Sequence, residues 1–135
     1  MSPSNVEITR RLYDAWNRQD VEGILADLDP EIEWRPYLAS VSGKPARGRD
    51  GVKAFLADYS ENWTTFRVDI EELFESGDDI VTFVHVFARG RESGAEVELS
   101  PGHHLVFRDG LLLRLTTHLD RGEALAAAGL RTTEK

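Results

Sequence analysis

VELSPGHHLVFRDGLLLRLTTHL, residues 97–119, holds two runs of β-forming residues on either side of Arg108-Asp109-Gly110. Asp-Gly between apolar runs is a strong hairpin signal, and successive side chains of a strand point to opposite faces. The stretch therefore predicts a long hairpin. If no bulge intervenes, one face of its first strand carries Leu99, Pro101, His103, Leu105 and Phe107. His103 stands in the middle of this largely apolar face.

The bulk composition is that of a globular, acidic chain. The 135 residues include 24 acidic and 16 basic side chains, for a net charge of −8, and 41% are hydrophobic. We expect one domain over residues 1–135, with a core at about 6–130. The negative charge disfavours nucleic acid or an anionic membrane as a partner. Cysteine is absent and the polar N-terminus has no signal-peptide pattern, so we expect a cytoplasmic protein without disulfides.

Helical periodicity comes early in the chain and strand patterns come late. The expected elements are helices at 6–17 and 20–29, a strand at 31–35, a loop at 36–48, a helix at 49–63, strands at 66–74, 80–89, 97–107 and 111–119, and a final helix at 120–129. The loop at 36–48 is either a lid over a site or a plain surface excursion. This order favours an α+β fold, with helices on one side of a mostly antiparallel sheet. A curved sheet with helices across its concave face makes a cone that needs a filler or a ligand.

Five stretches resemble the NTF2-like superfamily, in particular its SnoaL-like branch. They are YDAWNRQDVEGI, LDPEIEW, GRDGVKAF, GHHLVFRDG and HLDRGEALAAAGL. The resemblance covers about residues 6–130. It implies a cone-shaped, curved, mostly antiparallel sheet wrapped around N-terminal helices, as in the cystatin-like α+β barrel. It also implies an apolar pocket and a homodimer formed through the outer face of the sheet. Members of this fold include isomerases, cyclases and binding modules, so the fold does not fix the activity.

Ketosteroid isomerases of this fold give a useful comparison for the candidate catalytic residues. Their base Asp precedes a Pro after the first strand, where this chain has Arg35. Their helix-one Tyr aligns with Leu12, and their protonated Asp aligns with His103. These three departures argue against steroid isomerisation, because Arg stays protonated and cannot act as a general base. Arg35 could bind an anionic oxygen, or it could form an internal salt bridge with Glu33 or Glu98.

His103 is the leading candidate for a catalytic role. A neutral imidazole in an apolar pocket is both donor and acceptor, so it could act as a general base or orient a ligand oxygen. The alternative is a core histidine bonded to a neighbour. His85 belongs to the alternating set Val81, Phe83, His85 and Phe87, which the resemblance places toward the pocket, so His85 could assist. The alternative for His85 is a core or rim position.

The remaining histidines, His104 and His118, fall on the opposite faces of their strands and suit a dimer contact better than chemistry. The histidine spacing matches no metal-ligand pattern, and we expect neither metal nor cofactor. Asp120 is explained as a helix cap, although carboxylates near this strand end act as bases in some relatives.

Aromatic and apolar side chains at helix or strand spacing form either the core or the wall of a pocket. The predicted pocket residues are Trp16, Trp34, Phe55, Tyr59, Trp63, Phe83, Phe87, Leu105, Leu115 and Thr117.

Three functional hypotheses follow. The first is an enzyme that uses proton transfer on a small hydrophobic, oxygen-bearing molecule, with cyclisation, isomerisation or hydration as the reaction. In it His103 is the acid or base, His85 assists, and Arg35 stabilises negative charge. The second is a protein that binds such a molecule without catalysis. The third is a structural dimer whose core is filled by its own side chains.

Overall fold

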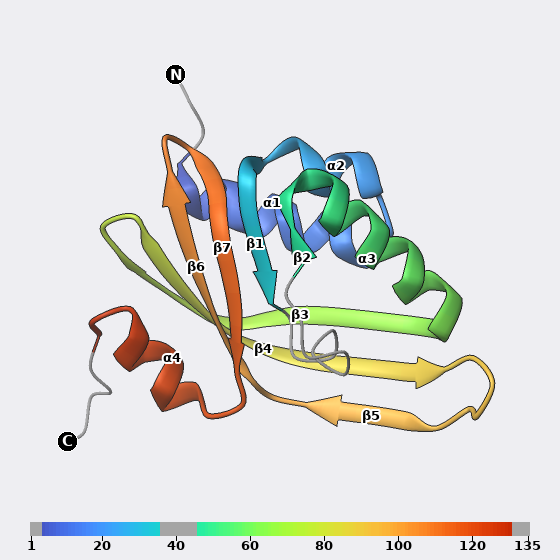
Figure 1. Ribbon diagram of the computed structural model, residues 1–135. Helices are drawn as coiled ribbons and strands as arrows, with labels where there is room; N and C mark the ends of the chain where they lie inside the picture. Colours follow the sequence, from blue (N-terminus) through green and yellow to red (C-terminus); the bar gives the residue numbers. More distant parts are fainter. Residues whose placement is uncertain (1–3, 36–45, 131–135) are drawn as a thin grey trace.

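The computed structural model describes residues 4–35 and 46–130, apart from the side chains of residues 58–60 and 62. Figure 1 shows how these residues form one curved sheet with helices on both of its sides. The elements are α1 (Asn5–Asn17), α2 (Val21–Ala26), β1 (Leu28–Arg35), β2 (Ala46–Arg47), α3 (Gly48–Asn62), β3 (Trp63–Ser76), β4 (Asp79–Gly90), β5 (Glu96–Leu99), β6 (Gly102–Arg108), β7 (Leu111–His118) and α4 (Arg121–Ala127). The predicted α+β class is confirmed.

The sheet has seven strands in the order β2-β1-β7-β6-β4-β3, with β5 paired to β4. Its pairs are antiparallel except β1 and β7, which run parallel. The pairing shifts between Ile70 and Glu72 in β3 and between Val106 and Phe107 in β6. Such bulges bend a strand and increase its twist. The sheet thereby curls around α1, α2 and α3 (Figure 1).

The predicted hairpin at 97–119 is interrupted. β5 and β6 both pair with β4 in one unbroken register, with Leu99 opposite Val86 and Gly102 opposite Phe83, so they form one long strand that is interrupted at Ser100-Pro101. β6 and β7 then form the hairpin around Asp109, which has φ 53°, and Gly110, which has φ 79°. The side chains of His103, Leu105 and Phe107 are buried on the concave face, as the alternation predicts.

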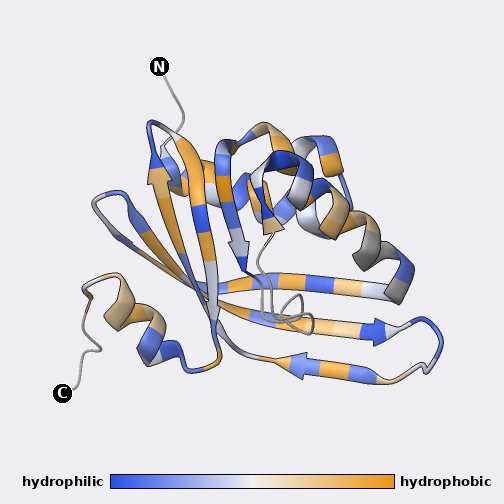
Figure 2. Cartoon of the chain, in the orientation of Figure 1, coloured by the Kyte–Doolittle hydropathy of each residue, from blue (hydrophilic) through white to orange (hydrophobic). Residues whose placement is uncertain are grey.

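The helix α1 packs its apolar stripe into the concave face. Ser4 and Glu7 form a reciprocal capping box at its start, which satisfies two backbone donors. Leu12 and Trp16 are almost completely buried. Figure 2 shows hydrophobic residues alternating with hydrophilic ones along the strands. The core therefore lies between α1, α2, α3 and the sheet.

The inner face of β4 is the opposite of the one predicted. Thr82, Val84, Val86 and Ala88 are buried there, while Phe83, His85 and Phe87 lie on the outer face. Alternation separates two faces but does not say which one is inside. The prediction that the aromatic set faces the interior is therefore wrong.

α4 lies on the outer face of the sheet, so the prediction of helices on one side only is also wrong (Figure 1). Its Ala124 and Leu125 pack with Val81 in a second apolar cluster. Arg121 donates hydrogen bonds to the carbonyl oxygens of Ser100 and Val84, and its guanidinium lies 4.9 Å from the ring centre of Phe83. Phe83, which the resemblance had placed toward the pocket, therefore packs on the outer face beside α4.

Two further expectations need adjustment. The second helix was expected to end at Asp29-Pro30, but α2 ends at Ala26 and β1 begins at Leu28. Most of the predicted loop at 36–48 lies outside the described residues, and residues 46 and 47 form β2.

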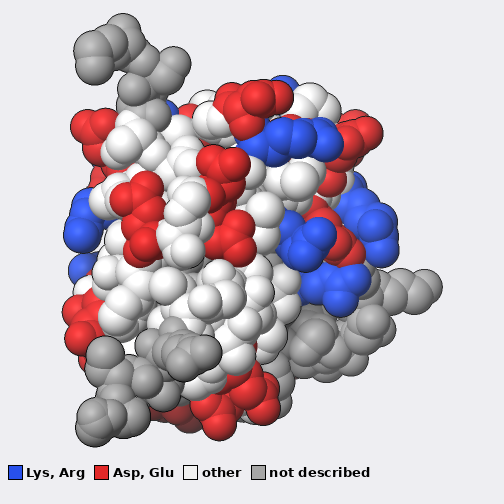
Figure 3. Space-filling model, turned by 90° about the vertical axis from the view of Figure 1, so that its left-hand side faces the viewer, with Lys and Arg blue, Asp and Glu red and all other residues white. Residues whose placement is uncertain are grey.

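Figure 3 shows separate acidic and basic groups on one face of the surface, and two further carboxylates, Asp27 and Asp29, are buried beside arginines. Arg108 donates to both carboxylate oxygens of Asp29, at 3.2 and 3.0 Å, and Arg11 donates to both of Asp27, at 3.0 and 2.8 Å. Among the described residues, no helix is long and apolar enough to cross a membrane.

Gly102 is the tightest contact between α4 and the sheet. A Cβ at this position would lie 2.7 Å from the Cβ of Ala124. We expect Gly102→Ala to lower the free energy of unfolding by about 1–3 kcal/mol, because overpacking forces backbone shifts. Ala124→Gly alone should cost about 1 kcal/mol through helix propensity. Because the second change removes the clashing methyl group, the double variant should cost less than the sum. Urea denaturation measures the free energy of unfolding of the two single variants and the double variant. If the cost of the double variant equals the sum of the two single costs, the contact between Gly102 and Ala124 is contradicted.

Candidate functional site

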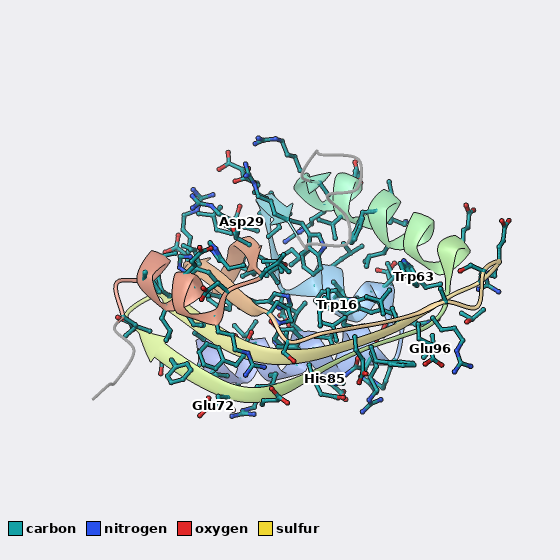
Figure 4. The ribbon with its side chains drawn as sticks, turned by 90° about the horizontal axis from the view of Figure 1, so that it is seen from below. Trp16, Asp29, Trp63, Glu72, His85 and Glu96 are labelled. Carbon is teal, nitrogen blue, oxygen red and sulfur yellow. The ribbon has the colours of Figure 1, made fainter. Side chains whose placement is uncertain are left out.

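A pocket of about 420 Å³ opens between α1, α2, α3 and the start of β3. The rings of Trp16, Trp63 and Phe66 form part of its largely apolar wall. In Figure 4, Trp16 lies in the middle of the molecule and Trp63 toward the end of the sheet beside α3. The lining residues are Trp16, Gln19, Val21, Glu22, Ile24, Lys53, Leu56, Ala57, Trp63 and Phe66. A concave, mostly apolar surface with a few polar groups is typical of a small-molecule site.

The end of α1 shapes one wall of this pocket. The side-chain amide of Asn17 donates to the carbonyl oxygen of Val68 and accepts from its N–H, both at 2.8 Å, which fixes α1 to β3. Gln19 then adopts a left-handed φ of 57°, and Asp20 caps α2. A non-glycine residue in this region costs roughly 1–2 kcal/mol. The turn places Trp16, Gln19 and the first residues of α2 on the same pocket.

Trp16 separates the pocket from the interior of the cone. Its ring stacks on Phe66 with centroids 5.7 Å apart, and on His103 with centroids 6.1 Å apart. Phe66 lines the pocket, whereas His103 is only 3% exposed. His103 therefore lies behind Trp16 as seen from the pocket.

His103 belongs to a buried chain of hydrogen bonds. Its Nδ1 lies 2.7 Å from the hydroxyl oxygen of Tyr13, and that oxygen lies 2.8 Å from Oγ1 of Thr82. Burial raises the pKa of the Tyr13 hydroxyl well above its ordinary value. Burial, together with the nearby His118, lowers the pKa of His103 to about 3. Both side chains are therefore neutral at neutral pH, and either the Tyr13 hydroxyl donates to Nδ1 or Nδ1–H donates to the Tyr13 oxygen.

The structure does not bring the three catalytic candidates together. His85 lies on the outer face, with Nε2 2.9 Å from a carboxylate oxygen of Glu98. Arg35 is half exposed and donates to Glu33 at 2.5 Å, which is the internal salt bridge that the sequence left as an alternative. Its hydrogen bond to Glu33 is the main cause that lowers the pKa of that carboxyl group.

The other predicted pocket residues are spread over four environments. Trp16 and Trp63 line the pocket, and the side chain of Tyr59 lies outside the described part of the chain. Trp34, Leu105 and Leu115 are fully buried in the core, and Phe55 is partly buried against it. Phe83 and Phe87 lie on the outer face of β4, and Thr117 is half-buried on β7.

Sequence reasoning missed two parts of the site. It did not find the contribution of α2 to the pocket, through Val21, Glu22 and Ile24, because that depends on how α2 sits against α3. It also missed Tyr13. The signal was present, because Tyr13 precedes Trp16 by three residues and so shares its helix face. Within residues 4–35 and 46–130, no three side chains of ligand type gather in a way that could hold a metal ion.

Residues 9–115 match the family model described as the SnoaL-like domain. The chain belongs to the SnoaL-like family. An NTF2-like protein of unknown function from Burkholderia pseudomallei is 27% identical, with 90% of this chain and 95% of that chain covered and a TM-score of 0.77. TerC, crystallised with polyporic acid, is 28% identical, with 93% and 96% covered and a TM-score of 0.75.

A third solved structure has the same fold at lower identity. A Mycobacterium tuberculosis protein in complex with estradiol-17β-hemisuccinate is 19% identical, with 87% of this chain and 93% of that chain covered and a TM-score of 0.73. A search of curated proteins finds no match. These SnoaL-like and NTF2-like relatives confirm the predicted family and fold.

We expect His103→Asn to flatten the dependence of stability on pH. The pKa of His103 is about 3 in the native protein and 6.5 in its ordinary state. Between these values the unfolded chain binds a proton that the native chain does not, so wild-type stability falls as pH falls, by at most about 1.4 kcal/mol per pH unit. The variant lacks this loss. The difference in free energy of unfolding between the wild type and the variant should therefore shrink on going from about pH 7 to about pH 4.

Urea denaturation at several pH values measures this effect. Leu105→Ala is the matched control, because it removes a fully buried side chain from the same strand without changing a titratable group, and its curve should run parallel to that of the wild type. A His103→Asn curve that also runs parallel would contradict a buried, neutral His103.

Proposed function

We propose that this protein binds a small, largely hydrophobic molecule in the pocket between α1, α2, α3 and β3. The observation that carries the proposal is the pocket of about 420 Å³ with three aromatic rings in its wall. Burial of apolar ligand surface supplies the main driving force, at roughly 25 cal/mol per Å². Gln19, Glu22 and Lys53 are the polar side chains that would orient the ligand.

The similarity to TerC supports a ligand of this class. TerC is 28% identical over most of both chains and was crystallised with polyporic acid. The net charge of −8 and the apolar lining argue for a small molecule rather than for nucleic acid or an anionic membrane. A cytoplasmic location stays a prediction from the sequence.

Proton-transfer catalysis is the second candidate, and the chain of His103, Tyr13 and Thr82 behind Trp16 favours it. A pKa of about 3 makes the imidazole of His103 a weak base at neutral pH. Hydrogen-bond donation to a ligand oxygen suits this environment better than proton abstraction. Binding without turnover is therefore the first choice.

We also propose a homodimer formed through the outer face of the sheet. α4 covers one part of that face, and β3, β4 and β5 present His85, Phe87 and charged residues on the rest. Sedimentation equilibrium at micromolar concentration should show a dimer. Phe87→Glu should dissociate it, because it replaces an aromatic side chain on the outer face with a charge that the interface would have to bury. A monomeric wild type would contradict this assembly.

A matched pair of variants tests the pocket. Ala57 lines the pocket, whereas Ala54, on the same helix, does not. We expect Ala57→Phe to weaken the binding of 2-ethylnaphthalene at least about tenfold, because the added ring fills space that the ligand needs. Ala54→Phe should leave the affinity within about twofold. Isothermal titration calorimetry measures both, and equal effects of the two variants would contradict binding in this pocket.

A further inference from the structure

A second cavity, of about 330 Å³, lies beside the pocket at the end of the sheet where β4 turns into β5. Glu61 and Trp63 line it from the junction of α3 with β3, and Gly90, Glu92 and Ser93 line it from the connection between β4 and β5. Figure 1 shows that the end of α3 and this connection lie at the same end of the molecule. We call this space the hairpin cavity.

Trp63 joins the hairpin cavity to the pocket, because it lines both of them. Val97, another lining residue, pairs with Ala88, whose side chain is buried on the concave face of the sheet. Directly paired residues share a face, so the hairpin cavity opens on the concave side. The two spaces are therefore neighbours on one side of the sheet, with Trp63 in a wall of each.

Arg91 holds the walls of the hairpin cavity together. Its Nε donates to the carbonyl oxygen of Glu61 at 3.2 Å, and its Nη2 donates to that of Trp63 at 3.4 Å. These bonds join the connection between β4 and β5 to the end of α3. Within the connection, the N–H of Gly90 donates to the carbonyl oxygen of Ala95 at 2.9 Å. The cavity is therefore bounded by segments that are hydrogen-bonded to one another.

Gly90 leaves room beside Trp63. The two residues are directly paired between β3 and β4, so a side chain at position 90 would stand next to Trp63 on the same face. A Cβ at this position would also lie 2.8 Å from Oγ of Ser93. A larger residue would crowd the turn and reduce the cavity, whereas glycine keeps it open.

The hairpin cavity offers hydrogen-bonding groups of every kind. Its wall carries the carboxylates of Glu61 and Glu92, the guanidinium of Arg91 and the hydroxyl of Ser93. A carboxylate accepts, a guanidinium donates and a hydroxyl does both. A ligand group rich in hydroxyls can therefore pair with all of them. An anion would face two carboxylates, and a cation would face the guanidinium, so a neutral polar group fits this wall best.

We propose that the hairpin cavity is a second subsite of the binding site and takes a neutral, hydroxyl-rich group, such as a glycosyl group, attached to the hydrophobic body in the pocket. The inference rests on the proposed function and narrows the ligand to an amphipathic molecule. Trp16 and Phe66 contact the apolar body, and Trp63 stands where the two parts of the ligand join. The polar side chains of the hairpin cavity bind the hydroxyls.

A series of naphthyl compounds tests the proposal by isothermal titration calorimetry. 2-Ethoxynaphthalene supplies the apolar body alone, and 2-naphthyl β-D-glucoside adds the sugar. We expect the glucoside to bind roughly five- to tenfold more tightly, as one or two net hydrogen bonds would give. The glucuronide carries a carboxylate in place of the hydroxymethyl group, and the 6-amino-6-deoxyglucoside carries an ammonium group there. Both should bind more weakly than the glucoside. A glucoside that gains nothing over 2-ethoxynaphthalene, or a charged analogue that binds best, would overturn the proposal.

Two substitutions assign the parts of the ligand to the two spaces. Ala95 lines the hairpin cavity, and Ala57 lines the pocket. Ala95→Phe should remove the gain from the sugar and leave the affinity for 2-ethoxynaphthalene within about twofold, because the added ring fills only the hairpin cavity. Ala57→Phe should weaken both ligands by the same factor and keep the gain. Retention of the gain in Ala95→Phe contradicts the second subsite.

Nuclear magnetic resonance on the wild-type protein separates this inference from the proposed function. Both ligands should shift the indole N–H signal of Trp63, whereas the backbone amide signals of Glu92 and Ser93 should respond to the glucoside alone. If 2-ethoxynaphthalene does not bind, or leaves Trp63 unmoved, the pocket proposal itself fails. If it binds but the glucoside leaves Glu92 and Ser93 unmoved, only the second subsite fails.

Discussion

The stack of Phe66, Trp16 and His103 is the interaction on which the rest of the structure depends. Trp16 comes from α1, and the two rings on which it stacks come from β3, at one end of the sheet order, and from β6, two strands away. The stack therefore holds the helix inside the curve of the sheet. The stack also forms the boundary between the pocket and the interior, because Phe66 lines the pocket and His103 does not. The bonds between Asn17 and Val68 keep the helix in this position.

The buried polar groups deepest in the interior are uncharged, because the buried carboxylates lie nearer the surface and form ion pairs there. Asp27, Asp29 and Glu33 are largely buried carboxylates, yet each has an arginine within hydrogen-bond distance near the surface. His103 and Tyr13 lie deeper, and burial moves the pKa of each in the direction that keeps it neutral. A site of this kind works through hydrogen bonds rather than through full charges.

The sequence predicts those features that depend on local pattern and fails at those that depend on packing between elements. The alternation around Leu105 grouped His103 with Leu105 and Phe107, and all three side chains are buried. Alternation could not select the inner face of β4, because both of its faces carry apolar residues. The resemblance selected the wrong face, since Phe83 packs outside with α4. Arg35 looked like a possible anion-binding group because its pairing with Glu33 is a side-chain arrangement that spacing alone cannot select.

Energetically unfavourable features gather around Trp16. Gln19 holds a left-handed backbone conformation three residues after it, and the buried indole N–H groups of Trp16 and Trp34 have no partner among the described residues. A glycine would remove the first cost, and apolar rings would remove the second. The starts of α1 and α4 follow their local rules, as the capping box of Ser4 and the cap of α4 by Asp120 show. Residues that break local rules tend to cluster where a protein acts, because selection for function offsets their cost. The concentration of such residues around one side chain supports the proposed binding of a ligand beside Trp16.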